Sequence, residues 1–283
     1  MKERTIADVL TEAQPYMKKY TGKTVVVKYG GNAMVNEALK NAVMEDVILM
    51  NMLGIRTVLV HGGGPEINAL LRKIGKEPKF VGGLRYTDPE TMDIVQMVLA
   101  GKINKDLVAR LCSRGGHAIG LCGVDADMIR CRRHMESDLG QVGDITAVRP
   151  QTIEQALGAG MIPVIATLGA DAAGVTYNIN ADTAASALAV ALHASKLVSL
   201  TDIPGVLRDK DDDATLIHEI RVDEVPGLVD AGVISGGMLP KISCCVDSIA
   251  GGVGEAVIID GRVPHAVLLE MFSDMGSGTL FYH

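Results

Sequence analysis

Polar side chains able to bind phosphate and carboxylate groups fall at the predicted strand ends of this sequence. They are two lysines, one arginine, two asparagines and two aspartates: Lys28, Lys241, Arg85, Asn178, Asn180, Asp182 and Asp202. Lysine is a mobile point charge that suits phosphate oxygens, whereas the planar guanidinium of arginine suits a carboxylate. Phosphoryl transfer needs mainly positioning and charge stabilisation, without a covalent nucleophile. The set therefore predicts phosphoryl transfer, with both lysines on phosphates and Arg85 on a carboxylate substrate.

Two predicted strands end in glycine-rich turns. The valine-rich strand at 24–28 leads to Gly30 and Gly31, and the strand at 55–61 leads into three glycines and Pro65. In open α/β sheets, ligands bind at the carboxyl ends of the strands. Glycine turns expose backbone N–H groups there, and Pro65 fits the first turn of a following helix. The repeated strand–glycine–helix unit therefore predicts a polyphosphate site.

The glycine spacing does not fit other nucleotide or hydrolase motifs. Gly-x-x-x-x-Gly-Lys-[Ser/Thr] and Gly-x-Gly-x-x-Gly are both absent, which excludes a P-loop and weakens a dehydrogenase interpretation. His61 precedes three glycines as in an esterase oxyanion loop, but no Gly-x-Ser-x-Gly elbow accompanies it. His61 and His117 are interpreted as hydrogen-bonded scaffold.

Alternating strand and helix patterns position these residues. Helices are expected at 5–20, 37–53, 65–74, 89–113, 183–192, 222–231 and after Lys241, and strands at 24–28, 55–61, 118–121, 162–166, 197–200, 257–259 and 279–281, with a hairpin within 128–148. Thr5 is a possible N-cap of the first helix, and Pro15 should kink or split that helix. Asp182 has a purely structural alternative as the N-cap of the helix at 183–192. The boundary between two lobes is predicted near residue 193.

Composition limits the class of protein. Apolar residues make up 48% of the 283, with no Trp and three Phe, so the core must be aliphatic, as is common in parallel-sheet α/β proteins. The net charge of −7 argues against nucleic-acid binding. No apolar run reaches the roughly 20 residues of a membrane span, and the start lacks a signal-peptide core. Five cysteines without a C-x-x-C pair indicate reduced thiols in the cytoplasm and no zinc site.

Five segments, in this order, resemble the acetylglutamate kinases of the amino-acid kinase superfamily. They are Lys28-Tyr29-Gly30-Gly31, His61-Gly62-Gly63-Gly64-Pro65, Gly83-Leu84-Arg85-Tyr86-Thr87, Asn178-Ile179-Asn180-Ala181-Asp182 and Gly236-Gly237-Met238-Leu239-Pro240-Lys241. The resemblance covers essentially the whole chain. It implies a three-layer α/β/α sandwich with a mainly parallel open sheet and two lobes. The expected division is an N-terminal helix at 1–22, an acyl-amino-acid lobe at 23–193 and an ATP lobe at 194–283.

The resemblance also implies an activity: ATP-dependent phosphorylation of the side-chain carboxylate of N-acetyl-L-glutamate in arginine biosynthesis, with Mg²⁺ held mainly by the phosphates. Lys28 and Lys241 would stabilise the transferring phosphoryl from two sides, and Asp182 would hold both lysines. The implied substrate-binding residues are Gly63, Gly64, Arg85, Asn178 and Asn180. The implied nucleotide-binding residues are Gly30, Gly31, Thr201, Asp202, Gly205 and Val206. No protein ligand to a metal is implied.

The N-terminal helix has two ordinary uses, packing on its own domain or docking on a neighbour. In the arginine-inhibited branch of the family, such a helix with a Pro-Tyr pair interlaces dimers into a hexamer, a trimer of dimers. L-Arginine then binds between this helix and the C-terminal lobe, which implies roles here for Tyr16, Glu270 and Gly276. This chain departs from that branch at Val257, where a histidine is common.

Two other functions stay open from sequence alone. A sister kinase could act on an acetylaminoadipate-like or carrier-linked acyl amino acid, because Arg85 would serve either substrate. A non-catalytic amino-acid sensor could keep the fold, although it would be expected to lose a lysine or Asp182. Binding of a regulatory protein is compatible with the kinase and has no separate signature.

Overall fold

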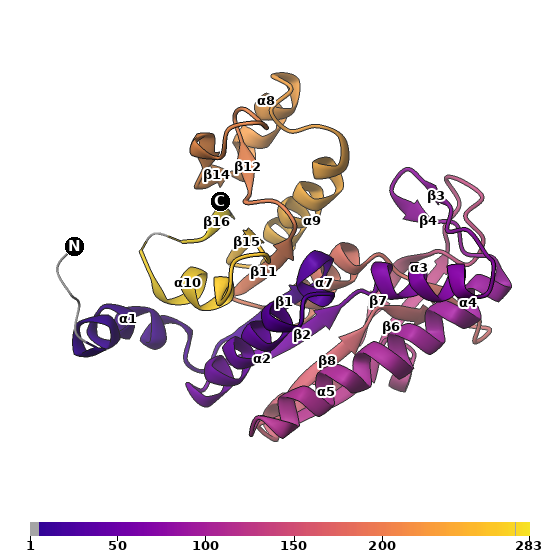
Figure 1. Ribbon diagram of the computed structural model, residues 1–283, viewed down its shortest axis with the longest axis horizontal. Helices are drawn as coiled ribbons and strands as arrows, with labels where there is room; N and C mark the ends of the chain where they lie inside the picture. The colour runs from indigo at the N-terminus through magenta and orange to yellow at the C-terminus, as the bar shows by residue number, and fades with distance from the viewer. Residues whose placement is uncertain (1–5, 275) are drawn as a thin grey trace.

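The computed structural model describes residues 6–274 and 276–283, which form a central eight-stranded sheet (Figure 1). The strands lie in the order β14-β16-β15-β11-β1-β2-β8-β5. Neighbours are parallel except the antiparallel pair β15 and β16. In chain order they are β1 (Thr24–Tyr29), β2 (Arg56–His61), β5 (Ala118–Cys122), β8 (Ile162–Ala166), β11 (Lys196–Thr201), β14 (Glu219–Arg221), β15 (Glu255–Asp260) and β16 (Gly278–Tyr282). The expected mainly parallel sheet is confirmed.

The valines of β1 show why this sheet is buried on both faces. Val25 and Val27 belong to one hydrophobic core and Val26 to the other, because successive side chains of a strand point to opposite faces. All six residues of β1 are buried, and the strand lies between β2 and β11. Lys28 therefore leaves the sheet from an enclosed central strand.

Helices cover both faces of the sheet, and α2 and α5 lie in front of it in Figure 1. The face of Val25 and Val27 is covered by α2 (Glu37–Met52), α3 (Gly64–Lys73), α4 (Pro89–Gln96), α5 (Asn104–Ser113) and α10 (Ala266–Phe272). The other face is covered by α6 (Gln151–Gly158), α7 (Ala181–Ala191), α8 (Val225–Asp230) and α9 (Leu239–Ala250). This arrangement is the expected three-layer α/β/α sandwich.

The long helix expected at 89–113 contains an irregular middle. Asp88 caps α4 by accepting a hydrogen bond from the Thr91 N–H at 2.8 Å. The π-helical segment Met97–Ile103 joins α4 to α5 without a break. Such wider turns occur frequently at functional sites, and apolar periodicity did not indicate this one.

Smaller elements surround the sandwich. A second sheet in the order β10-β9-β6-β7 contains β6 (Ile129–Arg133), β7 (Gly143–Val148), β9 (Leu168–Ala170) and β10 (Thr176–Asn178). The antiparallel pairing of β6 with β7 confirms the predicted hairpin. Two short hairpins are β3 (Phe80–Val81) with β4 (Leu84–Arg85), and β12 (Val206–Leu207) with β13 (Leu216–Ile217). The 3₁₀ turns are Gly31–Met34, Asp125–Asp127, Asp213–Thr215, Val222–Glu224 and Gly236–Met238.

The N-terminal helix α1 (Ile6–Tyr20) lies beside α10 (Figure 1). It runs through Pro15 as one helix, so the split considered from the sequence does not occur. The suggested N-cap, Thr5, lies outside the described residues. Ala13 and Tyr20 are buried, whereas Val9 and Leu10 are more than half exposed. The helix thus packs on its own chain and also leaves apolar side chains uncovered.

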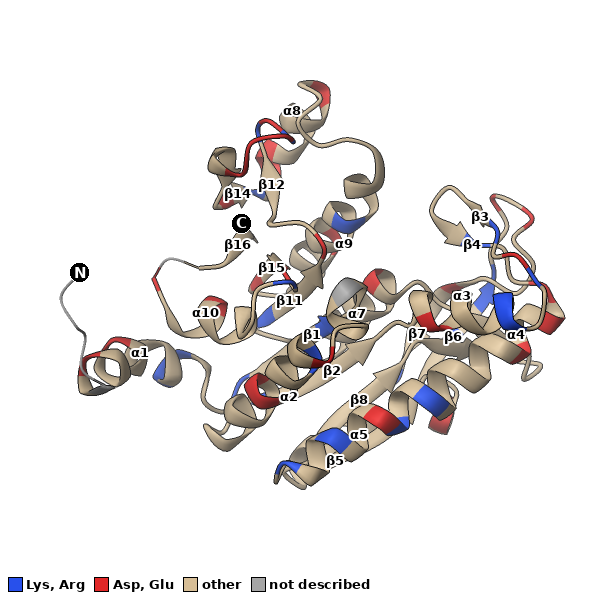
Figure 2. Ribbon diagram, viewed as in Figure 1, with Lys and Arg blue, Asp and Glu red and all other residues tan. Residues whose placement is uncertain are grey.

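Charge is spread over the surface elements. Figure 2 shows acidic and basic segments interspersed, with both signs along α5. The five cysteines are free. Within the described residues, no helix is both long and apolar enough to cross a membrane.

Candidate active site

Two lysines from distant parts of the chain share one carboxylate. Lys28 Nζ lies 3.0 Å from Asp182 Oδ1, and Lys241 Nζ lies 3.0 Å from Asp182 Oδ2. Lys28 comes from the carboxyl end of β1, while Asp182 and Lys241 come from the first turns of α7 and α9. The structure therefore brings together all three residues predicted to be catalytic.

The predicted location of Lys241 at a strand end is wrong. Gly236–Met238 form a 3₁₀ turn, and α9 begins directly afterwards at Leu239 with Pro240 in its first turn. Proline is favoured there because its missing N–H would have no partner within the helix. The lysine is consequently carried on a helix that packs against α7.

The structural alternative for Asp182, an N-cap, is also wrong. Asn180 is the N-cap of α7, and its Oδ1 accepts hydrogen bonds from the N–H groups of Asp182 (2.9 Å) and Thr183 (3.2 Å). Since Asn180 satisfies these N–H groups, the Asp182 carboxylate is available to the lysines. The positive end of the α7 dipole further favours a carboxylate in this turn.

Asp182 stays ionised despite its burial. Burial disfavours the charged form, but Lys28 and then Lys241 outweigh it and lower the pKa of Asp182 to about 2. The Asp182 side chain is 15% exposed and that of Lys28 is 7% exposed, whereas Lys241 is more open at 29%. The cluster holds two positive charges and one negative charge, and so presents net positive charge to a ligand.

The first glycine turn lets charged groups approach the backbone closely. A Cβ on Gly30 would come within 3.0 Å of Lys28 Nζ. Gly31 has a φ of +69°, and a Cβ there would collide with the Asp202 carboxylate. A side chain at position 30 would therefore displace the Lys28 ammonium, whereas Gly31 is favoured by its backbone conformation and by the nearby carboxylate.

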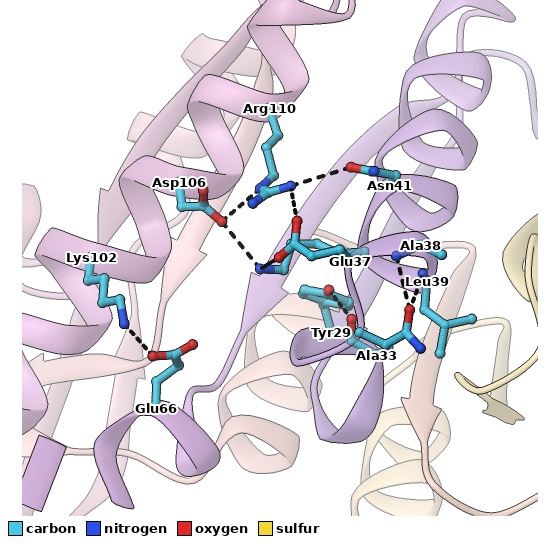
Figure 3. Close-up of polar contacts among 12 residues, drawn as sticks. Tyr29, Ala33, Glu37, Ala38, Leu39, Asn41, Glu66, Lys102, Asp106 and Arg110 are labelled. Carbon is cyan, nitrogen blue, oxygen red and sulfur yellow. Dashed lines mark hydrogen bonds and ion pairs between the residues drawn. The ribbon is translucent and has the colours of Figure 1, made fainter. Parts of the chain in front are cut away.

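Three hydrogen bonds fix the turn after Gly31, and they are drawn in Figure 3. The buried Tyr29 hydroxyl donates to the Ala33 carbonyl at 2.6 Å. Asn36 Oδ1 accepts from the N–H groups of Ala38 (2.9 Å) and Leu39 (3.1 Å), which caps α2. The 3₁₀ turn that contains Gly31 is thus attached at one end to β1 and leads at the other into a capped helix.

An ion-pair network, which the sequence analysis missed, braces the same region (Figure 3). Arg110 of α5 pairs with Glu37 at 2.8 Å and with Asp106 at 2.8 Å, and Lys40 pairs with Glu37 at 3.0 Å. Lys102 of the π-helical segment contacts Glu66 of α3. Helical spacing could have suggested the Asp106–Arg110 pair. The fold was needed to bring it to Glu37.

A cavity of about 250 Å³ opens beside the cluster. All five predicted substrate-binding residues line it: Gly63, Gly64, Arg85, Asn178 and Asn180. Lys28, Gly30 and Gly31 also border it, so predicted phosphate-binding groups reach the same space. Apolar lining side chains that sequence reasoning missed include Leu84, Leu99 and Val142.

Arg85 places an unpaired cation in this cavity. Its side chain is 6% exposed, and the guanidinium lies 4.7 Å from the centre of the Phe80 ring. Nη2 donates to the Gly64 carbonyl at 3.4 Å, while buried Nη1 has no hydrogen-bond partner. Burial lowers the pKa of Arg85 to about 10. Because no acidic side chain within residues 6–274 and 276–283 forms an ion pair with it, Arg85 is suited to an anionic ligand.

A second cavity of about 630 Å³ lies on the other side of the cluster. The predicted nucleotide residues Gly31, Thr201, Asp202 and Gly205 line it, together with Lys28 and Lys241. Val206 is not among its lining residues: this side chain is buried in the core, and its N–H donates to Thr279 Oγ1 at 2.8 Å. Two further cations that line the cavity, Lys210 and Arg262, were missed from the sequence.

A third cavity, about 180 Å³, lies between α1 and α10. It brings together Tyr16, Glu270 and Gly276, the three residues predicted to form an effector site. Glu270 pairs with the buried Lys196 at 2.7 Å and accepts from the Ser277 N–H at 2.9 Å. Val257, the position that departs from the predicted pattern, is fully buried in β15 and does not line this cavity.

Among the described residues there is no group of three or more His, Cys, Asp or Glu side chains placed to hold a metal ion. Both oxygens of Asp182 are engaged by lysines.

Comparison with known proteins identifies relatives over nearly the whole chain. The model of the amino acid kinase family matches residues 23–260. The acetylglutamate kinase of Heliobacterium modesticaldum is 53% identical over 97% of this chain and 97% of its own length. The acetylglutamate kinase of Actinobacillus pleuropneumoniae is 56% identical over 98% of this chain and 96% of its own length.

A solved structure is similar over 99% of the chain. N-acetylglutamate synthase from Neisseria gonorrhoeae in complex with coenzyme A and N-acetyl-glutamate superposes with a TM-score of 0.87 and 28% identity, and this chain spans 64% of it. The same synthase in complex with coenzyme A and L-arginine gives a TM-score of 0.82 and 26% identity, with 66% of that protein covered.

The lysine pair leads to a stability prediction for Asp182→Asn. Losing the carboxylate would leave two ammonium groups facing a neutral amide, which should lower the unfolding free energy by roughly 2 kcal/mol at pH 7. The contribution of Asp182 is fully present above its unfolded pKa of 3.8 and is lost as pH falls through about 2. In urea denaturation, the difference in unfolding free energy between wild type and variant should therefore become smaller below pH 4. The exposed Asp93→Asn on α4 is the control. Equal stability of Asp182→Asn and wild type at pH 7 would show that Asp182 does not stabilise the lysine pair.

Proposed function

The chain belongs to the amino acid kinase family and, within it, to the acetylglutamate kinases, and we propose that Lys28, Lys241 and Asp182 form its phosphoryl-transfer site. The protein is a carboxyl-group kinase of arginine biosynthesis that acts on N-acetyl-L-glutamate. A bond forms between a side-chain carboxylate oxygen of the substrate and the γ-phosphorus of ATP. The bond from that phosphorus to the β–γ bridging oxygen breaks, and ADP leaves. The attacking carboxylate is ionised at neutral pH, so this step needs no general base.

One observation carries the proposed site: Lys28 and Gly31 line both the 250 Å³ cavity and the 630 Å³ cavity. A phosphoryl group passing from a nucleotide in one to a carboxylate in the other would cross the junction at these residues. Lys28 and Lys241 would stabilise negative charge on its oxygens from two directions. Asp182, held by both, would keep the ammonium groups apart and aimed at this junction.

The two cavities also support the predicted division into lobes. All residues lining the smaller cavity lie within 23–193, which we propose is the acyl-amino-acid lobe. Apart from Lys28 and Gly31, the residues lining the larger cavity lie within 194–283, the proposed ATP lobe. Gly31, Thr201, Asp202 and Gly205 would contact the nucleotide there, whereas Gly30 lines the smaller cavity and would approach the transferred phosphoryl group from that side. We assign Val206 a supporting position behind the cavity wall.

Mg²⁺ fits this site as an ion held mainly by phosphates. Both Asp182 oxygens contact lysines, so we assign the ion to the phosphates of ATP. When bound, the ion would supply further neutralisation of phosphate charge. Because ATP is the phosphoryl donor, we place the enzyme in the cytoplasm.

Arg85 would bind the α-carboxylate of N-acetyl-L-glutamate. Its unpaired Nη1 is buried in the substrate cavity, and a carboxylate there would supply the missing charge and hydrogen-bond acceptor. Asn178 and Asn180 would contact the other polar groups, and Gly63 and Gly64 would contribute backbone. The apolar Leu84 and Val142 leave part of this cavity suited to the acetyl methyl group.

We further propose that L-arginine binds the cavity between α1 and α10. Glu219, Glu255, Glu270 and Asp274 line it together with Lys19 and Lys196, so both a guanidinium and an α-carboxylate would find opposite charge. The similarity to a synthase solved with L-arginine supports this assignment. Val257 does not line the cavity, so the charged groups that do line it are present in this chain despite its departure from the family pattern.

We propose that the exposed apolar residues of α1 dock on a second copy of the chain, within a hexamer that is a trimer of dimers. Val9 and Leu10 are 52% and 56% exposed on a helix that buries only Ala13 and Tyr20 among its described side chains. Covering them with α1 of a second copy would remove apolar surface from water. A solution mass near that of one chain, measured by light scattering, would contradict this assembly.

A hydroxylamine trap for acyl phosphate tests the activity. With ATP and Mg²⁺, we expect a signal from N-acetyl-L-glutamate and none from L-glutamate, L-aspartate or N-acetyl-aminoadipate. Lys28→Ala and Lys241→Ala should each lower turnover by about 10²–10³-fold because each removes a preorganised charge. Lys73→Ala at the exposed end of α3 is the matched control.

Other outcomes of the trap are equally informative. A signal only from N-acetyl-aminoadipate would show that the substrate is this longer acyl amino acid and not N-acetyl-L-glutamate. Silence on all four, from folded protein that binds ATP, would favour a carrier-linked substrate or a sensor. Near-wild-type turnover in both lysine variants would refute their catalytic role.

The variant Arg85→Gln tests whether Arg85 serves substrate binding without serving protein stability. It should raise KM for N-acetyl-L-glutamate about 100-fold, since a charged two-point contact is lost. It should not lower thermal stability, because it removes a buried cation that has no ion-pair partner. The exposed Arg72→Gln on α3 is the control. An unchanged KM would assign the α-carboxylate contact to another residue.

Glu270→Gln tests the effector site. Arginine inhibition should weaken by at least about tenfold, since a buried carboxylate facing the guanidinium would be lost. The measurement is a set of arginine titrations at fixed substrate, with exposed Glu136→Gln on the β6–β7 loop as control. Identical inhibition curves for Glu270→Gln and wild type would exclude this cavity as the effector site.

A further inference from the structure

His61 is fully buried at the carboxyl end of β2, directly before the second glycine turn. We propose that His61 and Asn104 are positioning residues that fix the Gly62–Gly63 peptide and thereby aim the Gly63 N–H at the transferring phosphoryl group. This inference rests on the proposed function, because it takes the substrate cavity lined by Gly63 as the place of reaction.

The side-chain amide of Asn104 determines the direction of the hydrogen bonds. Asn104 Nδ2 lies 2.9 Å from the Val164 carbonyl oxygen and 3.2 Å from that of Leu121, and carbonyls can only accept. Asn104 Oδ1 faces Lys105 Nζ at 3.0 Å, and an ammonium can only donate. The amide orientation is therefore fixed from both ends, with the NH₂ group as the donor.

This orientation determines which nitrogen of His61 carries the proton. The Asn104 NH₂ group also lies 3.2 Å from His61 Nε2. Its two hydrogens are shared among three acceptors, and an amide NH₂ cannot accept, so Nε2 is the acceptor in this contact. A neutral imidazole then has its proton on Nδ1, which lies 2.9 Å from the Gly62 carbonyl oxygen and donates to it. Burial lowers the pKa of His61 to about 4, so the ring is neutral at physiological pH.

The Gly62–Gly63 peptide is consequently held on several sides. The Gly62 N–H donates to the Tyr29 carbonyl at 3.2 Å, and the Gly62 carbonyl accepts from His61. In a planar trans peptide the carbonyl of Gly62 and the N–H of Gly63 point in opposite directions. Fixing the carbonyl on the His61 side therefore turns the Gly63 N–H away from His61.

The π-helical segment supports the same peptide. Leu99 and Ile103 pack so closely on Gly63 that a Cβ there would collide with both side chains. Asn104 follows this segment directly and reaches His61. The wider π turn thus places apolar contacts on Gly63 and a polar contact on the histidine before it. A donor held in this way is preorganised and need not reorient during phosphoryl transfer.

Nitrogen NMR of histidine-labelled wild-type protein tests the hydrogen-bond direction without any activity assay. We expect the Nδ1-protonated tautomer for His61, with its signal assigned by its loss in a His61 variant. An Nε2-protonated His61 would overturn the proposal. Because this readout needs no substrate, it separates failure of the inference from failure of the kinase assignment, which the hydroxylamine trap tests on wild type.

Two matched variants test the positioning role. The amide of His61→Asn takes roughly the place of Nδ1 and can still donate to the Gly62 carbonyl, whereas that of His61→Gln takes the place of Nε2. We expect His61→Asn to keep most of the wild-type kcat and His61→Gln to lose about 100-fold, with both KM values little changed. Thermal unfolding of the two variants provides the stability reference. Equal losses of kcat in two equally stable variants would show a packing role only and overturn the proposal.

Discussion

The shared carboxylate of Asp182 is the interaction on which the site depends. Two ammonium groups in one partly buried site would repel each other unless an anion between them offsets the repulsion. Asp182 binds Lys28 and Lys241 through separate oxygens at 3.0 Å each, and so holds them close but apart. The surplus positive charge of this cluster is what a polyphosphate can neutralise. The arrangement requires β1, α7 and α9 to meet at one end of the sheet.

The cations of the proposed site differ in whether an acidic side chain of the protein pairs with them, and this difference matches their proposed roles. The lysines of the cluster are partly neutralised by Asp182, so they can stabilise charge that develops during the reaction. Arg85 instead lacks an acidic partner and keeps an unsatisfied buried Nη1, which costs stability until an anion binds. The substrate cavity is thus preorganised for an anion, and this lowers the stability of the ligand-free protein.

Backbone groups at the two glycine turns are held from outside the site. Tyr29 and the capped start of α2 fix the first turn, while His61 and the π-helical segment fix the second. Each turn is thus held by a side chain from a sheet strand, Tyr29 of β1 or His61 of β2, and by an element of the helical layer formed by α2, α4 and α5. That layer therefore packs the core and also positions the donors that face the ligands. Between α1 and α10 lies a separate charged cavity, whose lining includes neither glycine turn.

The sequence by itself determined the order of elements, the buried strand of three valines, the glycine turns and the residue types that bind phosphate and carboxylate. These are local properties, set by side-chain alternation, turn chemistry and charge. The sequence also indicated that Lys28, Lys241 and Asp182 act together. It predicted the wrong element for Lys241, a strand end, and did not identify the N-cap residue of α7. Only the tertiary structure decided that Asn180 caps α7 and frees Asp182, that Arg85 has no acidic partner, and that a π turn packs on Gly63. Each of these depends on which groups meet across large separations in sequence, and such meetings are decided by packing and not by local pattern.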